Sequence, residues 1–529
     1  MSRTQTHIQK GDSILKQKIL IIGAGPAGLT AAYELMNTGK YDVTVFEESS
    51  YMGGISRTVN HNGNLMDTGP HRFFSKVPEG NEWWEHMMPN QGALPYDYKE
   101  LGRTAKLTDG GPDPNKTDRV MLRRNRITRI FFNRKFFDYP ISLKFSTIRN
   151  MGFFTTIAAG FSYLKSALHK RQEKSLEDFY VNRFGKKLYS MFFEYYTENL
   201  WGRHPSAISP EWGAQRVKGL SIVAILRDIF GKMFHSKNRK VETSLIEEFS
   251  YPKLGAGQIW EITAQETEKL GGKIITGAKV TRFIKDGNNI TALVYEKDGQ
   301  EYTETGDIII SSMPVKDLVN GMNDVPERIS FIASGLPYRD YRIAGVLVKN
   351  FCLKNETDIK TFGNIIPDEW IYVQDRDVKV GRIVIFNNWS PYMVKDLNNT
   401  VWLGLEYFCS EGDELWSMTN EEFAELGITE MLKMGLIASR DDVLDTHTER
   451  VKKAYPAYFD TYEHMDELRE WLDGITNLYC VGRNGQHRYN NIDHSMCTAF
   501  EAVKNILSGS HDKANIWNVN TEKEYHESK

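Results

Sequence analysis

Three glycines and one carboxylate near the start of the chain have the residue types and the spacing that bind a dinucleotide. Gly23, Gly25 and Gly28 form a G-x-G-x-x-G pattern, and Glu47 follows it by about 20 residues. In such a pattern the first glycine permits a tight turn, the second lets the backbone approach a pyrophosphate, and the third lets a helix pack closely on a strand. The acid can accept hydrogen bonds from a ribose diol. A flexible glycine loop is the alternative interpretation.

The flanking segments predict the elements that must position these residues. The apolar run 19–22 precedes the turn, an alanine-rich amphipathic segment follows it as far as residue 36, and a second apolar run, 43–46, ends at Glu47. This order predicts strand, glycine turn, helix and strand, with the phosphates at the positive N-terminal end of the helix. The flanking segments therefore favour dinucleotide binding over a flexible loop.

A second pair of glycines indicates which dinucleotide binds. Gly53 and Gly54 are followed by Ser56 and Arg57, which supply a second bare turn and a cation for the same pyrophosphate. This Gly-Gly-x-x-Arg extension resembles the flavoprotein superfamily that includes amine oxidases, protoporphyrinogen oxidase, phytoene desaturases and UDP-galactopyranose mutase. The resemblance implies FAD and not NAD. A Gly-Gly turn with a surface arginine is the alternative.

The segment 477–503 carries a narrower pattern. A short apolar strand, 478–481, leads into a polar loop and then into a small-residue helix that begins near Ser495, whose N-terminus can face the flavin. The pattern G-R-x-G-x-x-R-Y-x-x-x-D-H-S, which begins at Gly482, resembles that of UDP-galactopyranose mutases. The resemblance implies the following cofactor-binding residues: Gly23, Gly25, Pro26, Ala27, Gly28, Glu47, Glu48, Gly53, Gly54, Ser56, Arg57, His71, Gly482, Asp493, Ser495 and Met496.

The same resemblance implies a binding site for the diphosphate of a nucleotide sugar. Arg483 and Tyr489 would hold the diphosphate, Tyr455 and Arg382 would be a further tyrosine and arginine of that site, and Asp493 would lie near the flavin. Guanidinium forks and phenolic hydroxyls suit phosphoryl oxygens, and two arginines offset the charge of a diphosphate. The alternative is that Arg483 and Tyr489 only brace the flavin loop.

The loop 66–76 presents His71 after a Thr-Gly-Pro turn, because Pro70 blocks a helix there. It resembles the D-x-G-G-H-x-x-F loop of eukaryotic UDP-galactopyranose mutases, which lies against the isoalloxazine. This chain has Gly-Pro where that loop has Gly-Gly, and proline restricts the hinge. We predict His71, Arg483 and Asp493 to be the catalytic residues.

The reaction implied by the resemblance is the interconversion of pyranose and furanose forms of a nucleotide-diphosphate hexose such as galactose, with UDP, GDP or dTDP as the nucleotide. In that family N5 of reduced FAD attacks the anomeric carbon and displaces the nucleoside diphosphate, and NAD(P)H or another donor reduces the flavin. A cofactor that acts as nucleophile agrees with the lack of a Ser/His/Asp or Cys/His constellation. Two alternatives stay open: an oxidase or desaturase of the protoporphyrinogen oxidase and amine oxidase type, and a binding protein on the same fold, like the Rab GDP-dissociation inhibitors.

The expected fold class is α/β, or α+β over the whole chain, with a Rossmann-type FAD-binding domain, a helical insertion and a second antiparallel-sheet substrate domain. We expect residues 16–125, 241–325 and 471–508 to form the FAD-binding domain, 126–240 a mainly helical substrate domain, 326–470 the antiparallel-sheet domain, and 509–529 a loose polar tail.

Two further segments leave alternatives open. Residues 151–164 are the longest apolar stretch and are too short to span a bilayer, so we expect a buried helix, with an interfacial or substrate-covering helix as the alternative. Residues 126–140 alternate about Asn133 and Arg134 as a hairpin does. Seven Lys or Arg lie between Arg119 and Lys135, and they belong either to a solvated hairpin or to a contact with an anionic substrate.

The composition excludes some classes of function. The net charge of −3 argues neither for a nucleic acid nor for an acidic partner. The four cysteines show no metal-ligand spacing, so no metal site and a reducing compartment are expected. The first 16 residues lack the apolar core of a signal peptide. We therefore expect a cytoplasmic protein without an integral membrane segment. The oligomeric state is open, with a dimer as one option.

Overall fold

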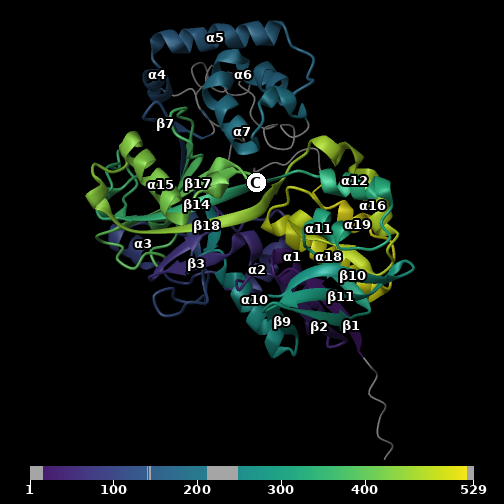
Figure 1. Ribbon diagram of the computed structural model, residues 1–529. Coiled ribbons are helices and arrows are strands. Elements are labelled where there is room, and N and C mark those ends of the chain that lie inside the picture. Colours follow the sequence, from purple (N-terminus) through teal and green to yellow (C-terminus); the bar gives the residue numbers. More distant parts are fainter. Residues whose placement is uncertain (1–15, 140, 142–144, 211–247, 521–529) are drawn as a thin grey trace, which may run out of the picture.

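A five-stranded parallel sheet lies at the centre of the nucleotide-binding half of the molecule (Figure 1). The computed structural model describes residues 16–139, 141, 145–210 and 248–520. The strand order is β19 (Leu478–Cys480), β13 (Ile308–Ser311), β1 (Gln17–Ile22), β2 (Tyr41–Glu47) and β9 (Lys273–Thr276). The three segments predicted for this domain thus each contribute at least one strand.

Both faces of this sheet are covered, which explains why its strands are continuously apolar. One face packs against α1 (Pro26–Asn37) and α10 (Gln258–Lys269), and α18 (Ile492–Ser508) packs on α1. On the other face, Leu20 and Phe46 share a core with Phe283 and Leu293. Phe283 and Leu293 belong to a three-stranded sheet of β10 (Lys279–Asp286), β11 (Asn289–Lys297) and β12 (Gln300–Thr305).

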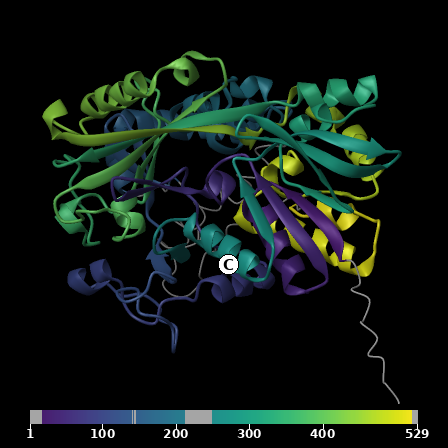
Figure 2. The same cartoon turned by 60° about the horizontal axis from the view of Figure 1, so that its bottom comes forward.

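A seven-stranded sheet forms the second half of the molecule and lies beside the first in both ribbon views (Figures 1 and 2). Its order is β18 (Val443–Pro456), β14 (Tyr338–Val348), β17 (Val401–Cys409), β16 (Arg382–Ile385), β15 (Trp370–Val373), β6 (Thr128–Phe132) and β7 (Lys135–Asp138). All pairs are antiparallel except β15 with β6. Helix α15 (Asn420–Met434) covers one face through Phe423 and Met431.

The hairpin predicted around Asn133 and Arg134 is confirmed as β6 and β7, and both turn residues have positive φ. The sequence grouped this hairpin with the helical segment 126–240, whereas in the structure it forms one edge of the seven-stranded sheet. The domain boundaries themselves remain predictions. Residues 211–240, also expected to be helical, lie outside the described residues.

Four helices form a cap at the top of Figure 1. They are α4 (Phe145–Met151), α5 (Phe153–Leu168), α6 (Leu176–Phe192) and α7 (Glu194–Trp201). The expectation that 151–164 is a buried helix is wrong, because Phe154 and Phe161 on α5 are 85% and 70% exposed. The apolar composition correctly predicted a helix, but among the described residues α5 packs mainly against α6, with a smaller contact to α4, and its other side is left uncovered.

The expectation of a loose tail over residues 509–529 is also wrong for its described part. Residues Ala514–Trp517 form α19, and Ile516 and Trp517 are buried. These two buried side chains anchor the polar segment in the core of the protein. Arg488 Nη1 also donates to the Val519 carbonyl at 2.9 Å.

The remaining elements connect these layers. They are η1 (Gly54–Ser56), β3 (Thr58–His61), β4 (Asn64–Asp67), α2 (Pro78–Met87), α3 (Tyr96–Leu101), β5 (Met121–Asn125), η2 (Pro205–Ala207), β8 (Glu248–Pro252), α11 (Val315–Asn320), α12 (Glu327–Gly335), η3 (Phe362–Asn364), α13 (Phe386–Trp389), α14 (Glu414–Ser417), η4 (Arg440–Asp442), η5 (Asp460–His464), α16 (Met465–Asp473) and α17 (Gly482–Gly485). The expected mixed α/β class is confirmed. Among the described residues, no helix has both the length and the apolar character needed to cross a membrane.

Candidate cofactor and substrate site

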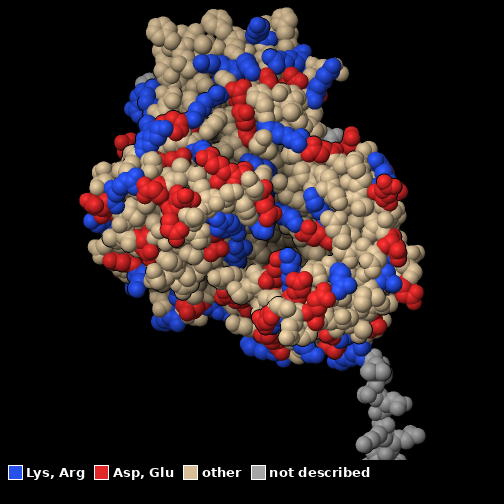
Figure 3. Space-filling view, in the orientation of Figure 1, with Lys and Arg blue, Asp and Glu red and all other residues tan. Residues whose placement is uncertain are grey.

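A cavity of about 1290 Å³ lies between the parallel sheet and the seven-stranded sheet. The glycine turn after β1, the tip of β2, the loop around His71 and the start of α18 line one part of it. Residues of β15, β16 and β18 line another part. The hollow at the centre of Figure 3 shows blue and red side chains around its opening. Ordinary small-molecule pockets hold about 300–1,000 Å³, so this cavity has room for a large ligand.

The glycine turn has the geometry that its sequence predicted. Gly23 has φ 97°, and a Cβ on Gly28 would lie 1.9 Å from the Gly23 carbonyl oxygen, so no larger residue fits between the turn and α1. The second glycine pair lies directly against the first turn, because Gly53 N–H donates to the Ala24 carbonyl at 2.8 Å. The two turns therefore form one bare backbone surface beside the N-terminus of α1.

Glu47 lines the cavity at the end of β2, as predicted from its spacing. One carboxylate oxygen accepts from the Ala24 N–H at 2.8 Å, and the other accepts from the Ser49 N–H and hydroxyl at 2.9 and 2.8 Å. These bonds fix the carboxylate at the cavity wall. A carboxylate fixed there is placed to accept hydrogen bonds from a ribose.

The residues present fit an FAD pyrophosphate. A Cβ on Gly25 would meet only the Gly54 Cα within 4 Å among the described residues, so the space in front of Gly25 is open to the cavity. Helix α1 has no side-chain cap at its N-terminus, and Arg57 Nε is buried without a hydrogen-bond partner in the described part of the chain. Arg57 also pairs with Glu449 at 3.2 Å, which holds its guanidinium at the cavity wall. Backbone amides at a helix N-terminus and a nearby arginine are groups that bind a pyrophosphate.

The predicted diphosphate residues are brought together in one cluster. Arg382 Nη2 donates to the Tyr455 hydroxyl at 2.5 Å, and the rings of Tyr455 and Tyr489 stack with centroids 5.7 Å apart. The guanidinium carbon of Arg483 lies 3.9 Å from the Tyr489 ring centroid and 5.1 Å from that of Tyr455. Arg382, Arg483 and Tyr489 line the cavity, whereas Tyr455 lies behind them.

Glu406 completes this cluster and was missed from the sequence. It is fully buried and accepts from Arg382 Nε. Burial raises its pKa and the Arg382 charge lowers it. The ion pair leaves Arg382 fixed beside Tyr455, and burial raises the pKa of Tyr455 to about 12, so its hydroxyl keeps its proton for another acceptor. Glu406 lies on β17 among apolar residues, and nothing in its local sequence marks it.

Arg483 has donors available for an anion. Its Nη1 donates to the Asn490 carbonyl at 3.3 Å, while its Nε and Nη2 are buried and have no hydrogen-bond partner among the described residues. Buried donors without partners are costly, and an anionic ligand satisfies them. The cavity wall as a whole carries nine Lys or Arg and five Asp or Glu within the described ranges, a charge balance that favours an anion.

His71 also lines the cavity. Burial, together with the charges of Arg483 and Arg382, lowers its pKa to about 4, although the Ile55 carbonyl acts in the opposite direction. The His71 Nε2 lies 2.8 Å from that carbonyl oxygen. A carbonyl oxygen only accepts, so Nε2 carries the proton and Nδ1 is left as an acceptor.

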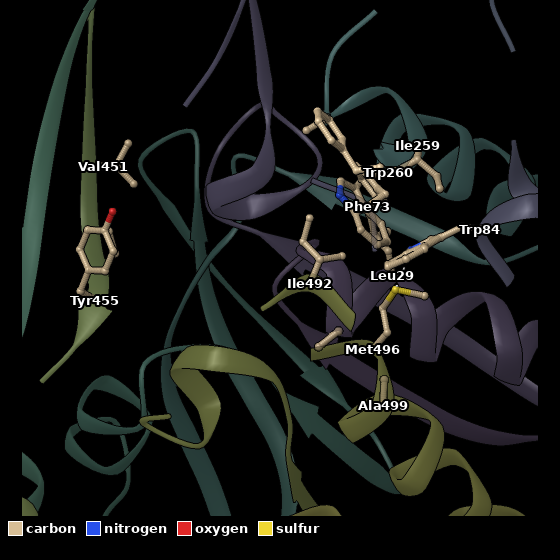
Figure 4. Close-up of a cluster of buried hydrophobic side chains, with 14 of the residues drawn as sticks. Leu29, Phe73, Trp84, Ile259, Trp260, Val451, Tyr455, Ile492, Met496 and Ala499 are labelled. Atoms are coloured by element: carbon tan, nitrogen blue, oxygen red, sulfur yellow. Dashed lines mark hydrogen bonds between the residues drawn. The ribbon is translucent and has the colours of Figure 1, made fainter. Parts of the chain in front are cut away.

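The C-terminal loop and helix are only partly at the cavity. Gly482, Asp493 and Ser495 line it, and Asp493 accepts from the Ser75 hydroxyl at 3.0 Å. The Met496 side chain does not reach the cavity and is instead completely buried, with its sulfur 3.0 Å from Trp84 Nε1 (Figure 4). Adjacent residues of α18, Ser495 and Met496, therefore face different environments.

The remaining predicted cofactor residues divide in the same way. Gly23, Gly25, Pro26, Ala27, Glu48, Gly54, Ser56 and Arg57 line the cavity, whereas Gly28 and Gly53 do not. The cavity wall also contains residues that were not predicted from the sequence, and these are Arg72, Arg126, Lys279, Trp370, Tyr372, Arg450, Lys452 and Lys453. Arg126 could have been found, since it belongs to the basic run before the hairpin. Most other cations of that run are in ion pairs, as Arg129 is with Asp368 at 2.6 Å.

Comparisons with known proteins place this site in a family. The profile described as flavin containing amine oxidoreductase matches residues 26–351. The mitochondrial protoporphyrinogen oxidase of Nicotiana tabacum is 22% identical over 523 residues, which cover 93% of this chain and 95% of that protein. A 4,4'-diapophytoene desaturase of Methylomonas sp is 44% identical over 52 residues, or 10% of each chain.

Solved structures show the same fold. Reduced UDP-galactopyranose mutase superposes with a TM-score of 0.74 over 96% of this chain and 99% of its own, at 21% identity. The resemblance inferred from the glycine and C-terminal motifs is thus confirmed at the level of the fold. Because the profile covers more than half of the sequence and includes part of the glycine turn, the second glycine pair and His71, the chain belongs to the flavin containing amine oxidoreductase family.

Proposed function

We propose that this flavoenzyme is a mutase that interconverts the pyranose and furanose forms of a nucleotide-diphosphate hexose, with FAD bound along the glycine turns. The observation that carries the proposal is the cluster of Arg382, Arg483, Tyr455 and Tyr489 at a cavity wall rich in cations. An arginine pair with tyrosine hydroxyls has the charge and the donors that a diphosphate needs. The fold shared with UDP-galactopyranose mutase supports the same conclusion.

In this proposal the protein residues bind the nucleotide sugar and orient it. Arg483 offers two unpartnered donors to phosphoryl oxygens, and Glu406 holds Arg382 in place for the same group. His71 stays neutral with its proton on Nε2, and Asp493 lies at the start of α18. When bound, reduced flavin supplies the nucleophilic nitrogen for attack on the anomeric carbon. The protein then has to supply position and electrostatic stabilisation.

An FAD-dependent oxidase or desaturase is the second candidate. Its support is the similarity over nearly the whole chain to a protein named protoporphyrinogen oxidase, together with the short match to a desaturase. A cavity wall with nine cations and five acids in the described ranges suits an apolar substrate poorly, which is why we rank this function second.

The redox state of the flavin distinguishes the two candidates. Purified enzyme is incubated with UDP-, GDP- and dTDP-hexoses, with and without dithionite, and both the isomer ratio and oxygen uptake are followed. The mutase isomerises its substrate only when reduced and consumes no stoichiometric oxygen. Oxygen uptake by the oxidised enzyme, driven by an apolar substrate and without any furanose, would instead establish the oxidase.

A further inference from the structure

Helix α5 presents an apolar stripe to solvent on the cap of the molecule, a feature that the proposed reaction does not use. Six large apolar side chains of this helix are between 42% and 85% exposed, and they are Phe153, Phe154, Ile157, Phe161, Leu164 and Leu168. At 100° per residue they fall within about 100° of arc on one side of the helix. The top of Figure 3, over α5, is accordingly tan, with blue among it.

The opposite side of α5 is the one that packs on the protein. Ala159 and Ser166 are buried there, and the Ser162 hydroxyl accepts from the Lys187 N–H of α6 at 3.0 Å. A Cβ on Gly185 of α6 would lie 2.7 Å from the Tyr163 backbone nitrogen, so the two helices are in close contact. The orientation of α5 is therefore fixed by its contact with α6, and the apolar stripe faces away from the described part of the protein.

The charges within the segment that carries the stripe are of one sign. Residues 139–172 contain no Asp or Glu and include Arg149, Lys165, Lys170 and Arg171. Arg171 pairs with Glu177 and Asp178 of α6, whereas no ion pair is found for the other three among the described residues. Lys165 is exposed in the last turn of α5, and Lys170 is exposed two residues after the helix ends. An apolar stripe flanked by basic residues is the composition of a helix that lies in the interface of a membrane with anionic lipids.

We propose that α5 docks this protein on an anionic lipid surface, with its apolar stripe among the lipid head groups and its basic residues against lipid phosphates. The helix has 16 residues, fewer than a bilayer span needs, so it lies in the plane of the interface. A second copy of the chain is the other partner that an apolar stripe could take. Charge disfavours that partner, since two such segments would bring like charges together.

The first test is flotation of the full-length holoenzyme with lipid vesicles. Vesicles of phosphatidylcholine alone are compared with vesicles of phosphatidylcholine and phosphatidylglycerol in equal parts. We expect the protein to float with the anionic vesicles, to bind the neutral ones weakly, and to lose binding as salt is added. Absence of flotation with the anionic vesicles overturns the proposal.

The second test removes the stripe without touching the core. In the Phe154→Ser/Phe161→Ser variant we expect the partition into anionic vesicles to fall at least about tenfold, because two exposed phenyl rings no longer enter the interface. Phe331→Ser/Leu507→Ser is the matched control, because both residues are exposed on other helices, and it should bind as the wild type does. Lys165→Glu/Lys170→Glu should weaken binding several-fold.

Three results of these measurements contradict membrane docking. Equal flotation of the stripe variant and the control shows that α5 is not the contact. A wild-type dimer that the stripe variant converts to a monomer, measured by light scattering without lipid, identifies a second copy as the partner. A lower melting temperature of the stripe variant than of the control, without lipid, shows that the two phenyl rings pack within the protein and not against lipid.

Discussion

At the scale of single residues, Arg483 is the group that most directly separates substrate binding from cofactor binding. Its Nε and Nη2 are buried donors without partners among the described residues. We expect Arg483→Ala to weaken binding of the nucleotide sugar by about 2–4 kcal/mol, since a charge-assisted partner of a buried phosphate is lost. Calorimetric titration measures the affinity, and absorbance of the purified variant measures its FAD content, which should not change.

The control for this variant is Lys452→Ala. Lys452 also lines the cavity, but its side chain is 62% exposed and pairs with Glu411 at 3.0 Å. Solvent screens such a pair, so we expect a loss below about 1 kcal/mol. If Arg483→Ala loses FAD and keeps its affinity for the nucleotide sugar, the arginine only braces the flavin loop.

His71 gives a prediction about pH. Its pKa is about 4 in the folded protein and near 6.5 in the unfolded chain, so the unfolded chain takes up a proton first as the pH falls. Its contribution to stability is complete above pH 6.5 and is lost as the pH falls toward 4. We expect the wild type to lose roughly 2 kcal/mol more than His71→Asn between pH 7.5 and pH 4.5. Urea unfolding at both pH values measures this, and equal losses in the two proteins contradict the low pKa.

At the scale of the helices, the contact between α5 and α6 depends on Gly185. Its φ is 77°, and an added Cβ would meet the backbone of Tyr163. We expect Gly185→Ala to lower the free energy of unfolding by at least about 2 kcal/mol, because the positive φ and the clash both add cost. Gly160→Ala is the control, since Gly160 lies inside α5 with open space around it, and alanine there should stabilise by up to about 1 kcal/mol. Urea unfolding of both variants measures the difference, and equal stabilities would show that the helices are not in close contact.

At the scale of the whole molecule, the cofactor cavity joins the two sheets, so FAD should stabilise both halves together. We expect FAD added to flavin-depleted protein at about 100 times its dissociation constant to raise the free energy of unfolding by about 2.7 kcal/mol. Gly25→Val should show no such gain, because the valine side chain would occupy the open space in front of the turn. Differential scanning calorimetry measures both proteins, and a wild type that melts at the same temperature with and without FAD contradicts the site.

Short-range patterns in the sequence were enough to predict the nucleotide-binding half. The tight turn at Gly23, the order of strand, helix and strand, and the position of Glu47 depend on residues within about 30 positions of one another. The turn residues Asn133 and Arg134 likewise marked the hairpin. Such features follow from φ preferences and apolar periodicity, which are properties of the local chain.

Only the tertiary structure decided the features that depend on contacts between distant segments. Glu406 and Tyr455 meet at Arg382 because strands β16, β17 and β18 lie in one sheet. The outward stripe of α5 likewise depends on which neighbours the helix has, and an apolar stretch has the same sequence whether it is covered or not. The periodicity of apolar residues predicts that a helix has an apolar side. Whether that side is buried depends on packing against residues elsewhere in the chain.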